Sequence, residues 1–372
     1  MGGTRKKNIL IQPDAGLGNR LYCLYSAFYY SMITDSGFDM IWLRENCCNV
    51  PLGKIIDLKS LPKGMRIHRT YHLGYKNIYC LPTVCSNIFM KLVKLRYRYY
   101  TSEDTRDIFN SKEELGFTEI FIDKKKSCIK ANGRFFDTKH FWNVRNAIRP
   151  SAAIRKRVEE IMGDYCNKET LDMILLTGRS AQAASENSGI YEYDDESDGI
   201  SESPGDVFNG EYNFVGDSDF PDARCQHGVI TASSKKSRPN GSISKNGSLA
   251  RIENKRVIGI HIRRTDNKTS IENSPTDSFK LLMRQLEAEN SNTWFYLATD
   301  DENLEIELKY KFKVIPHATF ADTKARDNVK SIMDAYVDML CLACCDKIYG
   351  SCGSSFSEMA ALIGNTELEL VK

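Results

Sequence analysis

The chain has 372 residues with an ordinary hydrophobic share of 41%, and its formal net charge at pH 7 is +2. Because domains usually hold roughly 100–200 residues, this length predicts two of them. The nearly balanced charge argues against a nucleic-acid partner, which normally demands a basic excess. The apolar run at residues 9–11 is too short for a signal peptide or a membrane span, so we expect a cytoplasmic protein without a membrane-spanning segment.

The first half of the chain opens with a pattern of strand, Gly-rich loop and helix. Residues 8–12 form an apolar run, a Gly-rich loop follows, and apolar side chains then recur at helical spacing from Asn19 to Met32. Residues 39–43 have the composition of a second strand. A strand–helix–strand start predicts a parallel sheet.

A long polar stretch divides the chain. Lys and Arg are absent between Arg179 and Arg224, where acidic, Ser and Gly residues accumulate. Such a composition cannot bury enough apolar surface to offset the entropy lost on ordering. We therefore predict a disordered insertion at residues 180–254, between an N-terminal domain (8–179) and a C-terminal domain (255–372). An acidic docking segment for a basic partner is the alternative interpretation of the insertion.

Strands and helices alternate most clearly after the insertion. The predicted strands are residues 257–262, 294–298 and 347–350. The predicted helices run from a Ser274 cap and Pro275 to about Glu289, from a capping box at 299–302 to Phe312, over 329–344, and over 356–363. This alternation predicts an α/β fold with two Rossmann-like domains, each built on a parallel sheet, that face each other.

The cysteines are expected to be reduced thiols, since disulfides are typical of secreted proteins. Cys341 and Cys344 form a CxxC pattern, but no second such pair completes a zinc site. We therefore interpret these residues as buried cysteines of a helix.

Four polar clusters fall where predicted strands end: residues 14–20, 263–266, 299–301 and 351–355. Ligands of parallel α/β sheets bind at the carboxyl ends of the strands, so this shared placement indicates one binding site. In the first cluster Leu21 stands where a dinucleotide fingerprint needs a third glycine, which disfavours a nucleotide-cofactor oxidoreductase. Its helix N-terminus can still bind a phosphate, and an ordinary strand-to-helix turn is the alternative.

The run His261-Ile262-Arg263-Arg264-Thr265-Asp266 carries the sharpest signal. Side chains alternate along a strand, so His261 and Arg263 share one face while Arg264 takes the other. A guanidinium binds phosphate at two points, which suits Arg263 to neutralise a departing nucleoside diphosphate. Arg264 could pair with Asp266 and hold the turn. Two solvated arginines at a strand end are the alternative.

The other two clusters are more ambiguous. Asp300 and Asp301 stand where helix capping alone would explain them, and a role in binding is the alternative. The loop from Ser351 to Ser355 precedes a helix and could cradle a phosphate or a base through its backbone amides. Serine and glycine also simply form loops.

Together the motifs resemble a known family. Gly16–Arg20, His261–Asp266, Ala298–Asp301 and Gly350–Ser357 occur in the order found in the α1,2-, α1,6- and protein O-fucosyltransferase superfamily, which includes the nodulation fucosyltransferases. The resemblance implies a GT-B fold with a central cleft, a GDP-fucose donor, inversion at the anomeric carbon, and no metal or other cofactor. It also implies a glycan or protein acceptor.

The resemblance further implies roles for single residues. Arg263 corresponds to the arginine that binds the β-phosphate of the donor, and His261, Arg264 and Asp266 would shape the same site. Glu272 lies near the place of a candidate catalytic base in the α1,6 branch. The remaining implied donor-binding residues are Gly18, Asn19, Asp300, Asp301, Ser354, Ser355 and Phe356.

We therefore predict a glycosyltransferase that moves fucose from GDP-fucose to a hydroxyl of a glycan or other acceptor. The long insertion at 180–254 and the spacing of Glu272 depart from the family pattern. A non-catalytic sugar-nucleotide or glycan-binding protein of the same fold is accordingly the alternative.

Overall fold

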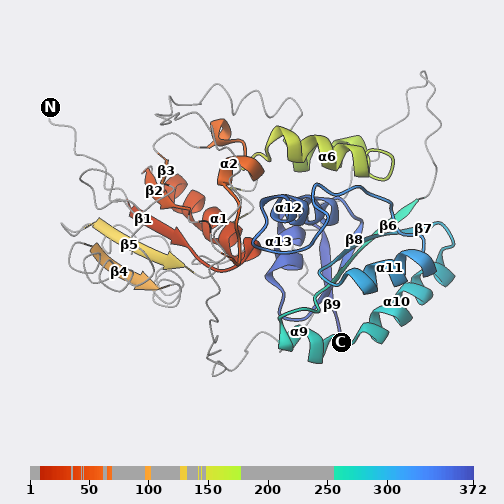
Figure 1. Cartoon of the computed structure of the whole chain (residues 1–372). Coiled ribbons are helices and arrows are strands. Elements are labelled where there is room, and N and C mark those ends of the chain that lie inside the picture. The colour runs from red at the N-terminus through yellow and green to blue at the C-terminus, as the bar shows by residue number, and fades with distance from the viewer. Residues whose placement is uncertain are drawn as a thin grey trace, which may run out of the picture.

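The computed structural model describes residues 9–34, 37–42, 44, 46–61, 65–68, 97–101, 126–131, 141, 144, 148–176 and 255–372. The predicted insertion at 180–254 lies outside these ranges, as do most residues between 69 and 147. The described elements form two parallel sheets with helices packed around them (Figure 1).

The N-terminal sheet has the strand order β3-β2-β1-β5-β4, and every pairing in it is parallel. Its strands are β1 (Ile9–Pro13), β2 (Phe38–Ile41), β3 (Arg66–His68), β4 (Tyr97–Thr101) and β5 (Lys126–Ala131). Helix α1 (Leu17–Thr34) follows β1 and begins slightly before the predicted Asn19. The predicted strand–loop–helix–strand start is thus confirmed.

The C-terminal sheet is also parallel, with the order β7-β6-β8-β9. Its strands are β6 (Arg256–Ile262), β7 (Thr293–Thr299), β8 (Lys347–Ser351) and β9 (Glu367–Val371). Its helices are α9 (Lys268–Asn273), α10 (Thr276–Glu289), α11 (Glu302–Lys311), α12 (Val329–Ala343) and α13 (Ser355–Gly364). The predicted alternation is confirmed, whereas α9 and β9 were not predicted.

Both faces of β6 are covered, as is usual in a parallel sheet. Its isoleucines, with Ile260 at the centre, pack in one buried cluster with Phe279 of α10 and Leu308 of α11. On the other face, a Cβ added at Gly259 would lie 2.9 Å from Leu342 Cδ2 of α12. Figure 1 shows α10 and α11 on one side of the sheet and α12 and α13 on the other.

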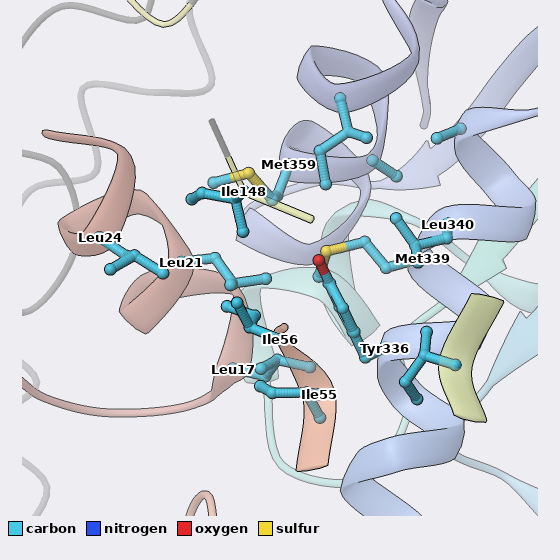
Figure 2. Packing of buried hydrophobic residues seen from close by; sticks show 14 of the residues in the cluster. Leu17, Leu21, Leu24, Ile55, Ile56, Ile148, Tyr336, Met339, Leu340 and Met359 are labelled. Carbon is cyan, nitrogen blue, oxygen red and sulfur yellow. The ribbon is translucent and has the colours of Figure 1, made fainter. Parts of the chain in front are cut away.

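A single hydrophobic cluster joins the helices of the two sheets. Helix α1 contacts α13 and α12, and α2 (Leu52–Ile55) also contacts α12. Figure 2 shows Leu17 and Leu21 of α1 opposite Tyr336 and Met339 of α12, all of them buried. Full burial of an apolar side chain contributes about 1.5–3 kcal/mol. The contact between the halves is therefore a substantial source of stability.

Two helices that precede the insertion pack on the C-terminal elements. Helix α6 (Ala152–Met162) contacts α12, and α7 (Lys168–Leu175) contacts α13. Beyond the end of α6, the Tyr165 ring lies edge-on to Trp294 of β7 with 5.3 Å between the ring centroids. The part of the chain assigned to the N-terminal domain thus contributes packing to the C-terminal sheet. The domain boundaries and the central cleft remain predictions.

The predicted Ser274 cap of α10 is wrong. Pro275 occupies the N-cap position and makes no side-chain capping bond. The Ser274 hydroxyl instead accepts a hydrogen bond from the Cys352 amide at 2.8 Å and donates to the Val371 carbonyl. Ser274 therefore ties the loop after β8 to the end of β9.

The cysteines at the end of α12 are buried, as predicted. Cys341, Cys344 and Cys345 are all free thiols in the hydrophobic cluster. Among the described residues, no three His, Cys, Asp or Glu side chains gather in a way that could hold a metal ion. Within the same ranges, every helix is too short or too polar to cross a membrane.

Candidate functional site

The candidate site lies at the carboxyl ends of β6 and β8. Strand β7 pairs with one edge of β6 and β8 with the other, so the strand order reverses here. Ligands of open α/β sheets bind in the crevice at such a reversal. The Arg263 amide donates to Ser351 Oγ at 3.0 Å, which joins the loop after β6 to the loop after β8. Two of the predicted polar clusters are therefore adjacent.

Arg263 is held between two carboxylates. Its Nη1 lies 2.8 Å from Asp300 Oδ2, and its Nη2 pairs with Asp266 Oδ1. A second guanidinium, that of Arg326, lies 2.9 Å from Asp266 Oδ2 through Nη1 and 3.1 Å from Oδ1 through Nη2. The Arg263 side chain remains 19% exposed. Its guanidinium is thus fixed in direction and still accessible.

Asp300 anchors the loop after β6. Its Oδ1 accepts the Arg264 amide at 2.7 Å, and its Oδ2 accepts the Thr265 hydroxyl at 2.7 Å. Burial raises the pKa of Asp300, but Arg263 and the bonds from Thr265 and Arg264 outweigh it and hold this pKa below its ordinary value. Asp300 therefore stays ionised beside Arg263.

Asp301, the next residue, has a different position. It is the N-cap of α11, and its Oδ1 accepts the Leu304 amide at 3.0 Å. The backbone amides in the first turn of a helix have no partner within the helix, and a capping side chain accepts a hydrogen bond from one of them. Helix capping thus accounts for the contact of Asp301, while Asp300 belongs to the arginine cluster.

Arg264 donates to two backbone carbonyls and to one hydroxyl at the start of α10. Its Nε donates to Thr276 Oγ1 at 2.8 Å, its Nη1 to the Arg263 carbonyl at 2.8 Å, and its Nη2 to the Ser274 carbonyl. Burial lowers the pKa of Arg264 from its ordinary value. Asp266 pairs with Arg263 and Arg326, so the pairing of Arg264 with Asp266 that the sequence suggested does not form.

His261 is buried at the end of β6. Its ring stacks on Phe356 of α13, with 4.8 Å between the centroids and 23° between the planes. Burial, followed by the nearby charge of Arg263, lowers the pKa of His261 to about 3, so the ring is neutral at pH 7. Within the described part of the chain, its Nδ1 has no hydrogen-bond partner. This nitrogen is a buried polar atom that a ligand could satisfy.

Helix α9 fixes the Gly/Ser loop after β8. Asn267 Nδ2 donates to the Gly353 carbonyl at 3.1 Å, and Ser270 Oγ donates to the Cys352 carbonyl at 2.7 Å. Gly353 has a φ of +72°, which glycine adopts without strain. The buried Ser354 follows as the N-cap residue of α13. The loop therefore leads to the N-terminal turn of α13, where Phe356 stacks on His261.

The loop after β1 reaches the same helix from the N-terminal half. Gly18 lies in the first turn of α1, where an added Cβ would lie 2.9 Å from Ser355 Oγ. The Tyr22 hydroxyl donates to Glu358 Oε2 of α13 at 3.1 Å. Asn19, half-buried, stands between these two contacts in α1. The structure therefore places the Gly-rich loop beside Ser355.

Glu272 is not joined to this cluster. It is exposed on α9, and no hydrogen bond or ion pair links it to another residue of the described ranges. Arg326 is the member of the cluster that the sequence did not indicate. It lies 60 residues beyond Asp266 and in no motif, so only the fold brings the two together.

Comparisons with known proteins concern the fold. No protein-family model matches the chain, and no curated protein sequence does. Among solved structures, the fucosyltransferase NodZ from Bradyrhizobium aligns with a TM-score of 0.50 and 12% identity over 97% of this chain and 93% of that one. The fold resembles that of NodZ.

Two further structures are similar at lower scores. NodZ alpha-1,6-fucosyltransferase soaked with GDP-fucose gives a TM-score of 0.49 at 12% identity, over 96% of this chain and 93% of that chain. The apo form of POFUT1 gives 0.48 at 9% identity, over 100% and 99%. The resemblance stated from the motifs is thus confirmed at the level of the fold by the first NodZ structure.

Proposed function

We propose that the chain is a GT-B glycosyltransferase that moves fucose from GDP-fucose to a hydroxyl of a glycan or protein. The observation that carries the proposal is Arg263, held by Asp266 and Asp300 at the reversal point of the sheet and still accessible. A fixed cation in a partly buried site stabilises a charge that develops during reaction. The NodZ-like fold supports a donor of this class.

In this proposal Arg263 binds the β-phosphate and neutralises GDP as it departs, without a metal ion. His261 Nδ1 makes a hydrogen bond to GDP-fucose. The backbone amides at the start of α13, near Ser354 and Ser355, donate to an oxygen of GDP-fucose. Asn19 contacts the donor from the N-terminal half. The acceptor oxygen attacks C1 of fucose, the bond to the phosphate oxygen breaks, and the configuration at C1 inverts.

Glu272 is the proposed base that takes the proton of the acceptor hydroxyl. Its exposure on α9 suits an acceptor that arrives from solvent. General-base catalysis contributes roughly 10²–10⁴ in rate, so Glu272→Gln should lower kcat by that factor with little effect on GDP binding. An unchanged kcat would remove Glu272 from the mechanism.

The direct test is incubation of the full chain with GDP-fucose or GDP-mannose and a library of glycans and peptides. Transfer from GDP-fucose, retained in excess EDTA, is the expected result. Transfer from GDP-mannose but not from GDP-fucose would contradict the proposal that fucose is the transferred sugar. Loss of transfer in EDTA would contradict the proposal that the enzyme needs no metal ion.

A non-catalytic GDP-sugar-binding protein is the second candidate, and one observation favours it. Glu272 makes no contact with the arginine cluster in the described ranges. Calorimetric binding of GDP-fucose without transfer to any library member and without hydrolysis would support this candidate over the first.

A further inference from the structure

Arg326 stands where no motif placed a functional residue. Its guanidinium contacts both oxygens of Asp266, and Arg263 contacts the same carboxylate. The Arg326 side chain is 34% exposed and the Asp266 side chain 53% exposed. Two guanidinium groups thus converge on one accessible carboxylate.

Stability alone gives a weak reason for this arrangement. Exposed ion pairs contribute little, and two guanidiniums beside one carboxylate also repel each other. Asp300 balances the charge of Arg263, so Arg326 and Asp266 form the second half of a four-charge cluster. Each guanidinium carries five N–H donors, and the contacts described for Arg326 use two of its nitrogens on Asp266. Arg326 therefore has further N–H groups that can donate to a second anion.

The backbone of Arg326 is held by the N-terminal half. The Asn49 amide donates to the Arg326 carbonyl at 3.1 Å, and Asn49 Nδ2 donates to the Asp327 carbonyl. Asn49 Oδ1 in turn accepts from Arg44 Nε at 2.7 Å. The second guanidinium is therefore positioned by a contact between the two halves of the molecule.

We propose that Arg326 is a binding residue that makes the site select a diphosphate over a monophosphate. This inference rests on the proposed function and deepens it. Arg263 and Arg326 bind oxygens on different phosphorus atoms, while Asp266 sets the spacing between the two cations. A monophosphate can contact only one of the two guanidinium groups. Asn49 is a positioning residue that keeps Arg326 beside Arg263.

The test is calorimetry on the full chain at fixed ionic strength with four probes: GDP, GMP, inorganic pyrophosphate and inorganic phosphate. The variants are Arg326→Gln, Arg326→Lys, Asn49→Ala and the control Lys330→Gln, which removes an exposed positive charge from the first turn of α12. Thermal unfolding of each variant shows whether it is folded.

Arg326→Gln should weaken GDP and pyrophosphate binding about tenfold or more, the usual effect of losing charge-assisted bonds, and should change GMP and phosphate binding less than about twofold. Arg326→Lys should recover part of the loss, Asn49→Ala should show part of it, and Lys330→Gln should show none. Equal losses for GDP and GMP, or no loss, would overturn the inference.

The inference and the proposed function can fail separately. If the unaltered chain binds pyrophosphate through Arg326 but binds neither GDP nor GDP-fucose, the proposed function is wrong and the inference stands. If it binds GDP and transfers fucose while Arg326→Gln keeps the same preference for GDP over GMP, the inference is wrong and the function stands. A chain that binds none of the four probes contradicts both.

Discussion

The loops after β1 and β6 have similar positions in their sheets but different roles. Each follows a parallel strand and leads toward a helix, and each has an arginine nearby: Arg263 lies in the loop after β6, and Arg20 lies in the first turn of α1 after the loop that follows β1. Arg20 is fully buried, and its Nε donates to the Ala15 carbonyl of its own turn at 2.7 Å. Its guanidinium also lies 5.5 Å from the centroid of the Trp42 ring. Arg263 instead ends between two carboxylates in an accessible position.

An arginine at a strand end therefore indicates a binding site only once its partners are known. Arg20 is part of the fold: it contacts the Ala15 carbonyl, the Trp42 ring and Cys47 Sγ inside the N-terminal half. Arg263 contacts two carboxylates, and an anionic ligand can compete with them for its guanidinium. We therefore expect the loop after β1 to stabilise the fold and the loop after β6, the binding loop, to bind the ligand.

The largest effect is expected from Arg263→Gln. Loss of the cation should lower kcat/KM for fucosyl transfer about 10²–10³-fold, or about 3–4 kcal/mol in the barrier, because charge on the departing GDP is no longer stabilised. The thermal unfolding temperature should change little. The control is Arg284→Gln on the exposed surface of α10, which should leave kcat/KM unchanged. Equal rates for the two variants would contradict the assignment of the binding loop.

Arg20→Met should show the opposite pattern. The variant removes a buried charged donor from the turn after β1, so the free energy of unfolding in urea should fall by about 2–3 kcal/mol. The molecules that remain folded at low temperature should keep a near-normal KM for the donor. A large rise in KM with unchanged stability would show that both loops bind the ligand.

The sequence predicted the alternation of elements well, for a local reason. Strand β6 and helices α10 and α12 carry their apolar pattern within a short segment, whereas α11 was predicted from the capping signal before it. Helix α9 escaped prediction because it has only six residues; it contacts β8, and Asn267 and Ser270 make hydrogen bonds to the loop after β8. Strand β9 has only two buried residues, Leu368 and Val371, so its pattern was too weak.

The site was predicted by its motifs but not by its connections. Asp266 and Arg326 meet only because the loops before α9 and α12 fold to the same place. The Ser274 hydroxyl was assigned a local capping bond, whereas distant partners in the folded chain take it. Contacts of this kind depend on tertiary structure, which spacing along one chain does not encode.

His261 should make the binding loop sensitive to pH, while the loop after β1 contains no histidine. Burial lowers the pKa of His261 to about 3, whereas an unfolded histidine takes up its proton near pH 6.5. As the pH falls from about 6.5 toward 3, only the unfolded state binds the proton. The free energy of unfolding should therefore fall by up to about 1.4 kcal/mol per pH unit. Between pH 6.5 and 5 this amounts to about 1.6 kcal/mol, because the slope at pH 6.5 is only half its maximum.

The measurement is urea unfolding of the native chain and of His261→Phe, which keeps an aromatic ring against Phe356, across that pH range. The difference between the two curves isolates the histidine from the carboxylates. Above about pH 7.5, one unit beyond the pKa of the unfolded histidine, the difference should be constant. A pH-independent difference between pH 4 and 6.5 would mean that His261 titrates in the folded protein as it does when unfolded.

Gly18→Ala should have the smallest effect and tests the contact between the two loops. The added Cβ would lie 2.9 Å from Ser355 Oγ, which can rotate away, but also 3.1 Å from the Ser355 carbonyl oxygen, which cannot move without shifting α13. Overpacking of this kind costs about 1–3 kcal/mol, and the better helix propensity of alanine returns up to about 1 kcal/mol. A net loss of about 1 kcal/mol in the free energy of unfolding is therefore expected. Ser355→Ala in the same chain should recover only the hydroxyl part of this loss, so full recovery would show that the backbone contact is unimportant.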